Sequence, residues 1–105
     1  MIQDLSPTEF KNILDNPNSL LIDVREDWEF KLCSIGGARL MPMSTFAQTY
    51  DELGKSRDLA IYCHHGVRSM RVIHFLQSQG YENLINLRGG IDAWSNEIDS
   101  SVAKY

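Results

Sequence analysis

Residues 59–69 read LAIYCHHGVRS, and this stretch joins two kinds of sequence pattern. The apolar run Leu59–Tyr62 is typical of a buried strand, whereas apolar residues recur at helical spacing over 68–79. Cys63 lies between the two patterns, among polar residues. A structural cysteine behaves as a small hydrophobic residue and prefers apolar neighbours. We therefore expect a displayed thiol at the exit of a strand, on a loop that leads into a helix.

Strand and helix patterns alternate along the rest of the chain. Ser6, Pro7 and Glu9 form a helix start with a capping box, and this helix is expected to run to about Asp15. Further strands are expected at 20–24, 38–41 and 84–87, and further helices at 26–32, 44–53 and 91–96. The alternation predicts a small parallel α/β sheet covered on both faces. The tail 100–105 has little to pack against and is expected to fray.

The composition is that of one globular domain, which we place at residues 1–105. The chain is 43% hydrophobic and 23% charged, with a net charge of −4, and this negative field argues against a nucleic-acid partner. No apolar run approaches the roughly 20 residues that span a bilayer, and no secretory signal is evident. Two cysteines, Cys33 and Cys63, are too few for a disulfide framework. A cytoplasmic protein with free thiols and no membrane partner is therefore expected.

The loop from Cys63 to Arg68 has the composition of an anion cradle. Because it precedes a helix, its backbone N–H groups have no intrahelical partners and can turn inward as a nest. The helix dipole and Arg68 then favour the thiolate, which is the reactive form of cysteine, and Gly66 permits the tight curl. Two chemistries fit these residues: a sulfur atom carried on Cys63 as a persulfide, or a tetrahedral oxyanion attacked by the same thiolate.

Three motifs resemble those of the rhodanese-like sulfurtransferases. They are Cys-x4-Arg at 63–68, Leu-Ile-Asp-Val-Arg-Glu at 21–26 with Glu29-Phe30 and Ile35–Ala38, and Leu-Arg-Gly-Gly-Ile-Asp-Ala-Trp at 87–94. The motifs occur in the family's order, and the resemblance covers about residues 5–98. One stretch departs from the family: residues 33–38 read CSIGGA where the common pattern is Gly-His-Ile-Pro-Gly-Ala. These positions are mostly structural in the family, so the departure does not affect the expected chemistry.

The resemblance implies a doubly wound parallel sheet of about five strands flanked by helices on both faces. It also implies transfer of a sulfane sulfur through a persulfide on Cys63, the catalytic nucleophile. The active-site loop that cradles the persulfide then consists of His64, His65, Gly66, Val67 and Arg68. The implied donor is a small molecule such as thiosulfate, and the implied acceptor is cyanide, a thiol or a protein. No metal and no organic cofactor are implied.

The length of the loop separates the two chemistries within this resemblance. Sulfur-handling members have the six-residue loop seen at 63–68, whereas the related phosphatases and arsenate reductases have one residue more. In this family Asp23 and Arg25 are mostly structural, either as ion pairs or as bracing of the loop behind the active site, and we expect the same of both here. Arg71 and Arg88 are expected to add positive charge at the rim of the site.

Two other functions remain open from the sequence. One is a persulfide relay module with a protein donor and little activity on thiosulfate, because His64 and His65 replace the fixed cations of thiosulfate-using members. Their charge changes between about pH 5 and pH 8. The other is a redox sensor in which Cys33 and Cys63 form a disulfide. A metal site is not expected, since adjacent histidines generally point apart and no paired ligand spacing is present.

Overall fold

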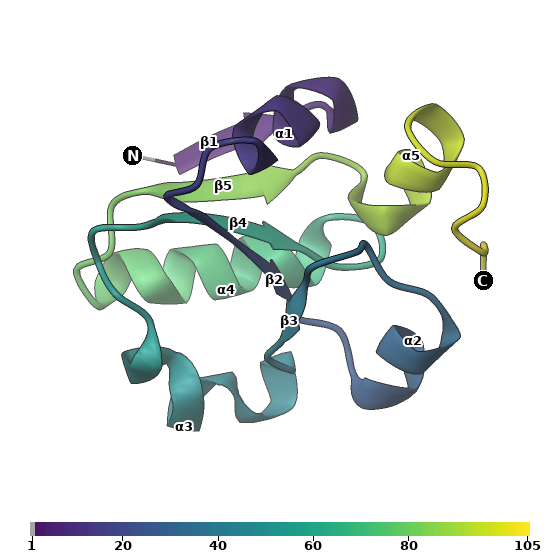
Figure 1. The fold of residues 1–105 in the computed structure, drawn as a ribbon. Helices are drawn as coiled ribbons and strands as arrows, with labels where there is room; N and C mark the ends of the chain where they lie inside the picture. The colour runs from purple at the N-terminus through teal and green to yellow at the C-terminus, as the bar shows by residue number, and fades with distance from the viewer. Residues whose placement is uncertain (1) are drawn as a thin grey trace.

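The computed structural model describes residues 2–105 and contains a five-stranded parallel sheet (Figure 1). Its strands are β1 (Ile2–Leu5), β2 (Ser19–Asp23), β3 (Arg39–Leu40), β4 (Asp58–Tyr62) and β5 (Leu84–Leu87), in the spatial order β1-β5-β4-β2-β3. The helices are α1 (Pro7–Leu14), α2 (Asp27–Leu32), α3 (Phe46–Thr49), α4 (Val67–Ser78) and α5 (Gly90–Glu97). The predicted α/β class and parallel sheet are confirmed.

Helices cover both faces of the sheet, as the sequence predicts (Figure 1). On one face α1 and α5 pack their apolar side chains, including Phe10 and Trp94, against the sheet. On the other face α4 supplies Val72, Ile73 and Leu76, with α3 beside it. Each fully buried side chain of this size contributes about 1.5–3 kcal/mol through removal from water. The sheet therefore lies between two separate hydrophobic cores.

The first helix begins as its capping pattern predicts. The Glu9 N–H donates to Ser6 Oγ at 3.3 Å and the Ser6 N–H donates to Glu9 Oε1 at 3.1 Å. The strand β1 that precedes it is not apparent from the sequence, because Gln3 and Asp4 interrupt its apolar pattern. It pairs in parallel with β5, in register from Ile2 opposite Leu84 to Leu5 opposite Leu87. The edge of the sheet is therefore completed by a strand that lies far away in the sequence.

The prediction of one continuous helix at 44–53 is wrong. The segment folds as two 3₁₀ turns, η1 (Met43–Thr45) and η2 (Tyr50–Glu52), on either side of the one-turn helix α3. Thr45 and Thr49 interrupt it with φ values of −121°, and each Oγ1 donates to the carbonyl three residues earlier, at 3.5 and 3.4 Å. Threonine hydroxyls of this kind compete with regular helical hydrogen bonding.

The direction of the chain connections reverses between β2 and β4. β2 is followed along the chain by β3 on one side, and β4 is followed by β5 on the other. In doubly wound sheets such a reversal leaves a ligand-binding crevice at the carboxyl ends of the two strands. Asp23 and Tyr62 are aligned across these strands, so the residues that follow them share this edge.

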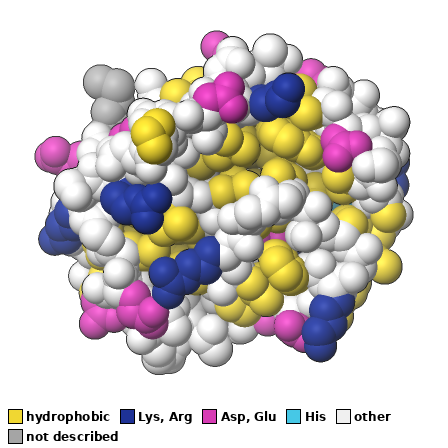
Figure 2. Space-filling model, in the orientation of Figure 1, with side chains coloured by type: hydrophobic (Ala, Val, Ile, Leu, Met, Phe, Trp, Pro, Cys, Tyr) yellow, Lys and Arg dark blue, Asp and Glu magenta, His cyan; other side chains and the backbone are white. Residues whose placement is uncertain are grey.

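No helix within residues 2–105 has the length and apolar character needed to cross a bilayer. On the face of the molecule seen in Figure 2, Lys and Arg side chains are interspersed with Asp and Glu side chains.

Candidate active site

Cys63 lies at the start of the loop that joins β4 to α4. Its Sγ accepts a hydrogen bond from the Gly66 N–H at 3.1 Å and lies 3.3 Å from Ser69 Oγ. Gly66 adopts a left-handed conformation with φ +103°, which glycine accepts readily and other residues resist. The expectation of a displayed thiol is wrong, because Cys63 is only 1% exposed. The loop curls over the sulfur and donates at least one backbone N–H to it.

The carbonyl groups of the loop are held by the first turn of α5. Cys63 O accepts from the Ile91 N–H at 2.9 Å, and His64 O accepts from the Asp92 N–H at 3.1 Å. The first N–H groups of a helix lack intrahelical partners, so the loop carbonyls provide the hydrogen-bond acceptors that the first turn of α5 needs. In return, α5 fixes the orientation of these two peptide groups of the loop. A Cβ on Gly90 would lie 2.3 Å from His64 O, and Gly90 has φ +63°. Only glycine fits at this contact.

A line of hydrogen-bonded polar groups leads away from the sulfur toward β1. The hydroxyl of Ser69, which is fully buried, donates to Asn86 Oδ1, and Asn86 Nδ2 donates to Asp4 Oδ1 at 2.9 Å. Ser69 was not singled out from the sequence as a site residue. Its position in the first turn of the helix behind the thiol is the signal that could have found it.

Arg68, at the far end of the loop, forms a two-pronged ion pair with Glu29 of α2. The two N···O distances are 2.6 and 2.8 Å, and the Glu29 side chain is 4% exposed. Hydrogen bonds from Arg68 lower the pKa of Glu29 to about 2, and the same bonds raise the pKa of Arg68. The positive charge of Arg68 is therefore balanced by a carboxylate next to the loop.

Asp23 and Arg25 form a fully buried ion pair at the end of β2. Asp23 accepts from the backbone N–H, Nε and Nη2 of Arg25, the shortest at 2.7 Å. Arg25 also donates to the Cys33 carbonyl at 2.6 Å. Burial by itself lowers the pKa of Arg25, but its hydrogen bonds to Asp23 and Tyr105 outweigh that effect and leave the pKa raised. Of the two structural roles expected for these residues, an ion pair is present.

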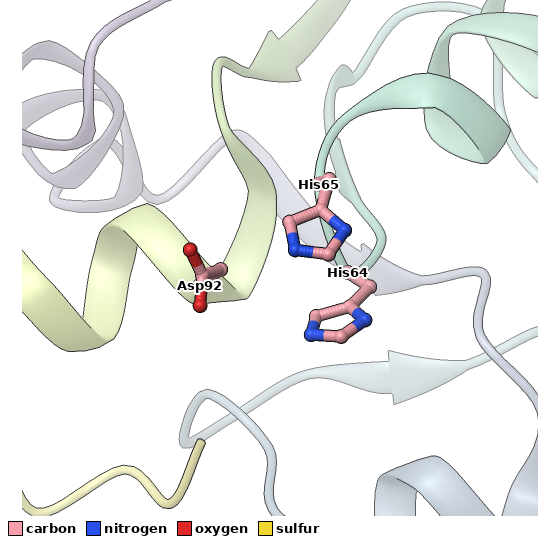
Figure 3. Close-up of side chains that lie close together, drawn as sticks. All are labelled: His64, His65 and Asp92. Carbon is pink, nitrogen blue, oxygen red and sulfur yellow. The ribbon is translucent and has the colours of Figure 1, made fainter. Parts of the chain in front are cut away.

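His64 and His65 stack on each other instead of pointing apart. Their ring centroids are 3.9 Å apart with planes at 26°, and Asp92 of α5 lies beside them (Figure 3). The expectation that adjacent histidines point apart is wrong here. It holds for an extended strand, in which successive side chains point in opposite directions, but the backbone of this loop curls and brings the two rings together. Burial and the neighbouring His65 lower the pKa of His64.

The same three side chains are the group within residues 2–105 whose ligand atoms could hold a metal ion, since these atoms lie within 4.8 Å of one another. The Asp92 carboxylate already accepts a hydrogen bond from Lys104 Nζ at 2.7 Å, and this bond lowers the pKa of Asp92. The Lys104 ammonium thus supplies the positive charge that a cation would bring to this carboxylate. The two histidine rings are nearly parallel, so their nitrogen lone pairs do not converge on one point.

The C-terminal tail is ordered, contrary to expectation. The Tyr105 ring stacks on His64 with centroids 3.9 Å apart and planes at 6°. Its hydroxyl donates to Glu29 Oε2 at 2.7 Å and accepts from Arg25 Nη1 at 2.8 Å. Burial raises the pKa of Tyr105 to about 12. The ring and hydroxyl contacts of Tyr105 thus hold in place a tail whose sequence gave no reason to expect an ordered structure.

A hollow of about 460 Å³ lies beside the loop. Its lining includes His65, Gly66 and Val67 from the loop, together with Arg71 and Arg88. Arg88 is tied to Asp4 by an ion pair at 3.4 Å. Both arginines line this hollow beside the loop, and a positive rim at the site itself stays a prediction.

The two thiols belong to different cores. Cys63 is part of the core between the sheet and α4, whereas Cys33 packs against the core between the sheet and α1 and α5. Both cysteines are free. They therefore pack against cores on opposite faces of the sheet.

Known proteins share both the sequence and the fold. The model of the rhodanese-like domain family matches residues 6–97. A sulfurtransferase from Allochromatium vinosum is 38% identical over 85 residues, covering 81% of this chain and 79% of that protein. The rhodanese-like/PpiC domain-containing protein 12 of Arabidopsis chloroplasts is 32% identical over 112 residues, and the match covers 99% of this chain but 38% of that longer protein.

Among solved structures, a rhodanese-like domain protein from Staphylococcus aureus superposes with a TM-score of 0.82 at 30% identity, covering 98% of both chains. Sequence motifs, sheet topology and overall superposition agree along nearly the whole length. The chain belongs to the rhodanese-like domain family.

Proposed function

We propose that this chain is a sulfurtransferase that carries a sulfane sulfur as a persulfide on Cys63. The observation that carries the proposal is the Gly66 N–H aimed at Cys63 Sγ, 3.1 Å away, within a six-residue loop. Inward N–H groups stabilise the thiolate and the charge on a persulfide. The amides of His64 to Arg68 are the cradle in this proposal.

Two displacements complete the reaction. The Cys63 thiolate attacks the outer sulfur of a donor such as thiosulfate, the S–S bond of the donor breaks, and sulfite leaves with the electron pair. An acceptor nucleophile, such as cyanide or a thiolate, then attacks the terminal sulfur of the persulfide. The Cys63–S bond breaks and the Cys63 thiolate is restored. Neither step needs a metal or an organic cofactor.

Other residues support this chemistry without contacting the transferred sulfur. Glu29 holds Arg68 at the end of the loop, and the Asp23–Arg25 pair fills the neighbouring strand end. Free thiols and this reaction suit a reducing compartment such as the cytoplasm. We assign the activity to residues 1–105 acting as one domain.

A second function is favoured by the charges around the loop. Arg68 is balanced by Glu29, Lys104 by Asp92, and Arg25 by Asp23. Few unbalanced cations then remain to attract the thiosulfate dianion, apart from Arg71 at the adjacent hollow. This arrangement supports a relay module that takes sulfur from a protein persulfide. The redox-sensor alternative is weakened by the placement of the two thiols in different cores.

Intact-protein mass spectrometry tests these proposals. The reduced chain is incubated with thiosulfate, or with a cysteine desulfurase and cysteine, beside Cys63→Ser and Cys33→Ser. A gain of one sulfur with thiosulfate, reversed by cyanide and lost only in Cys63→Ser, is expected of the enzyme. A gain only with the desulfurase identifies the relay module. No gain in either reaction overturns both.

A further inference from the structure

We propose that Tyr105 is a positioning residue for the sulfur-carrying loop and acts on both ends of it. The proposal rests on the function proposed above and assigns a role to a tail that the family motifs do not reach, since they end at Trp94.

The first contact is with the second residue of the loop. The His64 ring lies 3.9 Å from the Tyr105 ring and 3.9 Å from the His65 ring, nearly parallel to both. Two rings cannot occupy the same face at that distance, so His64 is sandwiched between them. A stacked imidazole cannot change rotamer without losing this contact, and aromatic pairs of this kind add about 0.5–1.5 kcal/mol beyond burial. Tyr105 therefore restrains the His64 side chain and, through it, the adjoining peptide groups.

The second contact reaches the last residue of the loop. The Tyr105 hydroxyl donates to Glu29 Oε2, the oxygen that also accepts from Arg68 Nη2 at 2.8 Å. The same hydroxyl accepts from Arg25 Nη1, so both of its hydrogen-bonding functions are used. Charge-assisted hydrogen bonds in a partly buried site are stronger and more directional than exposed ones. Tyr105 thus fixes the carboxylate that fixes Arg68.

The tail that carries Tyr105 is itself attached to α5. Ser95 Oγ donates to the Val102 carbonyl at 2.7 Å, and Lys104 pairs with Asp92 at 2.7 Å. Asp92 is also the residue whose N–H holds the His64 carbonyl. The helix that holds the loop from one side therefore also carries the tail that holds it from the other. Such restraint acts on the geometry of the cradle, and misplacement by about 1 Å is enough to cost catalysis about a hundredfold.

Graded replacement of Tyr105 tests the proposal in the full chain. Tyr105→Phe keeps the stack and removes the hydroxyl, whereas Tyr105→Leu removes both. With the sulfur donor found to load Cys63, kcat/KM is expected to fall about threefold in Tyr105→Phe and about tenfold in Tyr105→Leu, the latter equal to about 1.4 kcal/mol. Tyr50→Phe is the matched control, because it removes a tyrosine hydroxyl bonded to Gln79, away from the loop.

A second readout does not depend on sulfur transfer. The His64 ring is titrated by NMR in the wild type and in both variants. The groups that face it are His65, Asp92, Glu29, Arg68 and Tyr105. Loss of the Tyr105 ring exposes the imidazole, so its pKa is expected to rise toward the ordinary value in Tyr105→Leu and much less in Tyr105→Phe. A side chain that only stabilised the tail would leave this titration unchanged.

The outcomes separate the two proposals. If Cys63→Ser still carries sulfur, the proposed function fails whatever Tyr105 does. If Cys63→Ser is inactive while both Tyr105 variants match Tyr50→Phe in kcat/KM and in the His64 titration, the positioning role is wrong. Thermal unfolding of every variant confirms that the comparison is made on folded protein.

Discussion

The ends of β2 and β4 occupy equivalent places in the sheet but are built in opposite ways. The two strands pair in parallel and finish in register at Asp23 and Tyr62. After β2 the chain buries an ion pair, and the side chains of Asp23 and Arg25 are both 0% exposed. After β4 it curls around a thiol and leaves Val67 at the surface, 63% exposed.

The difference shows that, at one edge of the sheet, the end of one strand stabilises the fold and the end of its neighbour forms the site. At the end of β2 the polar groups satisfy one another, so nothing is left to bind a ligand. At the end of β4 the carbonyl groups are taken by α5 and a backbone N–H is directed at the sulfur. Substitutions after β2 should therefore act on stability, and substitutions around the β4 loop should act on sulfur transfer.

The largest effect is expected from Asp23→Ala. Removing the carboxylate leaves the guanidinium of Arg25 buried without its counter-charge, which typically costs about 3–5 kcal/mol of unfolding free energy. Urea denaturation measures the loss. The double variant Asp23→Leu/Arg25→Met should recover much of it, because no unpaired charge remains buried. A single variant as stable as the wild type would contradict the contrast between the two strand ends.

Gly90→Ala is expected to impair sulfur transfer. The new Cβ would meet His64 O at 2.3 Å, so the loop must shift. A shift of about 1 Å predicts roughly a hundredfold loss of kcat/KM for sulfur transfer. Gly54→Ala is the control, since a Cβ there meets nothing within 4 Å. Equal activities in the two variants would show that α5 does not set the shape of the loop.

The smallest effect is expected from Glu29→Gln, and it depends on pH. The pKa of Glu29 is lowered to about 2 by Arg68, below its ordinary value of about 4.3 in an unfolded chain. This carboxylate therefore adds stability that is fully present above the unfolded value and is lost as pH falls toward 2.

The measurement is unfolding free energy from pH 6 to pH 2 in wild type and variant. Glu29→Gln should be less stable near neutrality and should lose less stability over the acid range. Glu97→Gln, at an exposed carboxylate, should leave the profile of the wild type. If the unfolding free energy of Glu29→Gln fell between pH 6 and pH 2 as steeply as that of the wild type, the Glu29–Arg68 ion pair would not be a source of the acid sensitivity.

The parts of the fold that local chemistry specifies were predictable. The run Leu59–Tyr62 and the run Leu84–Leu87 are buried strands by composition, and the capping box of α1 was correctly located. β1 was missed because a short edge strand has a weak pattern of its own and forms through pairing with β5. The segment 44–53 was predicted as one helix because helical pattern reading does not register threonine hydroxyls that bind the backbone.

The site was predictable where its residues are adjacent in sequence. Cys63 and its loop were identified together, but Glu29, Asp92 and Tyr105 are brought to it by the topology. The partner of Arg68 lies 39 residues away and that of Arg25 Nη1 lies 80 residues away. No spacing rule connects such positions. The stacking of His64 and His65 likewise follows from the curl of the loop and not from their order.

The hydrogen bonds from α5 to the loop also affect the order in which the site forms during synthesis. A chain emerging from a ribosome offers Cys63 well before Ile91 and Asp92, whose N–H groups fix the loop carbonyls. At about 5–20 residues per second, that interval lasts roughly 1.5–6 s. During this interval β2 and β4 can already pair, but the loop around Cys63 still lacks its hydrogen bonds from α5. The newly made protein therefore passes through a stage in which Cys63 is more exposed than in the finished fold, where it is 1% exposed.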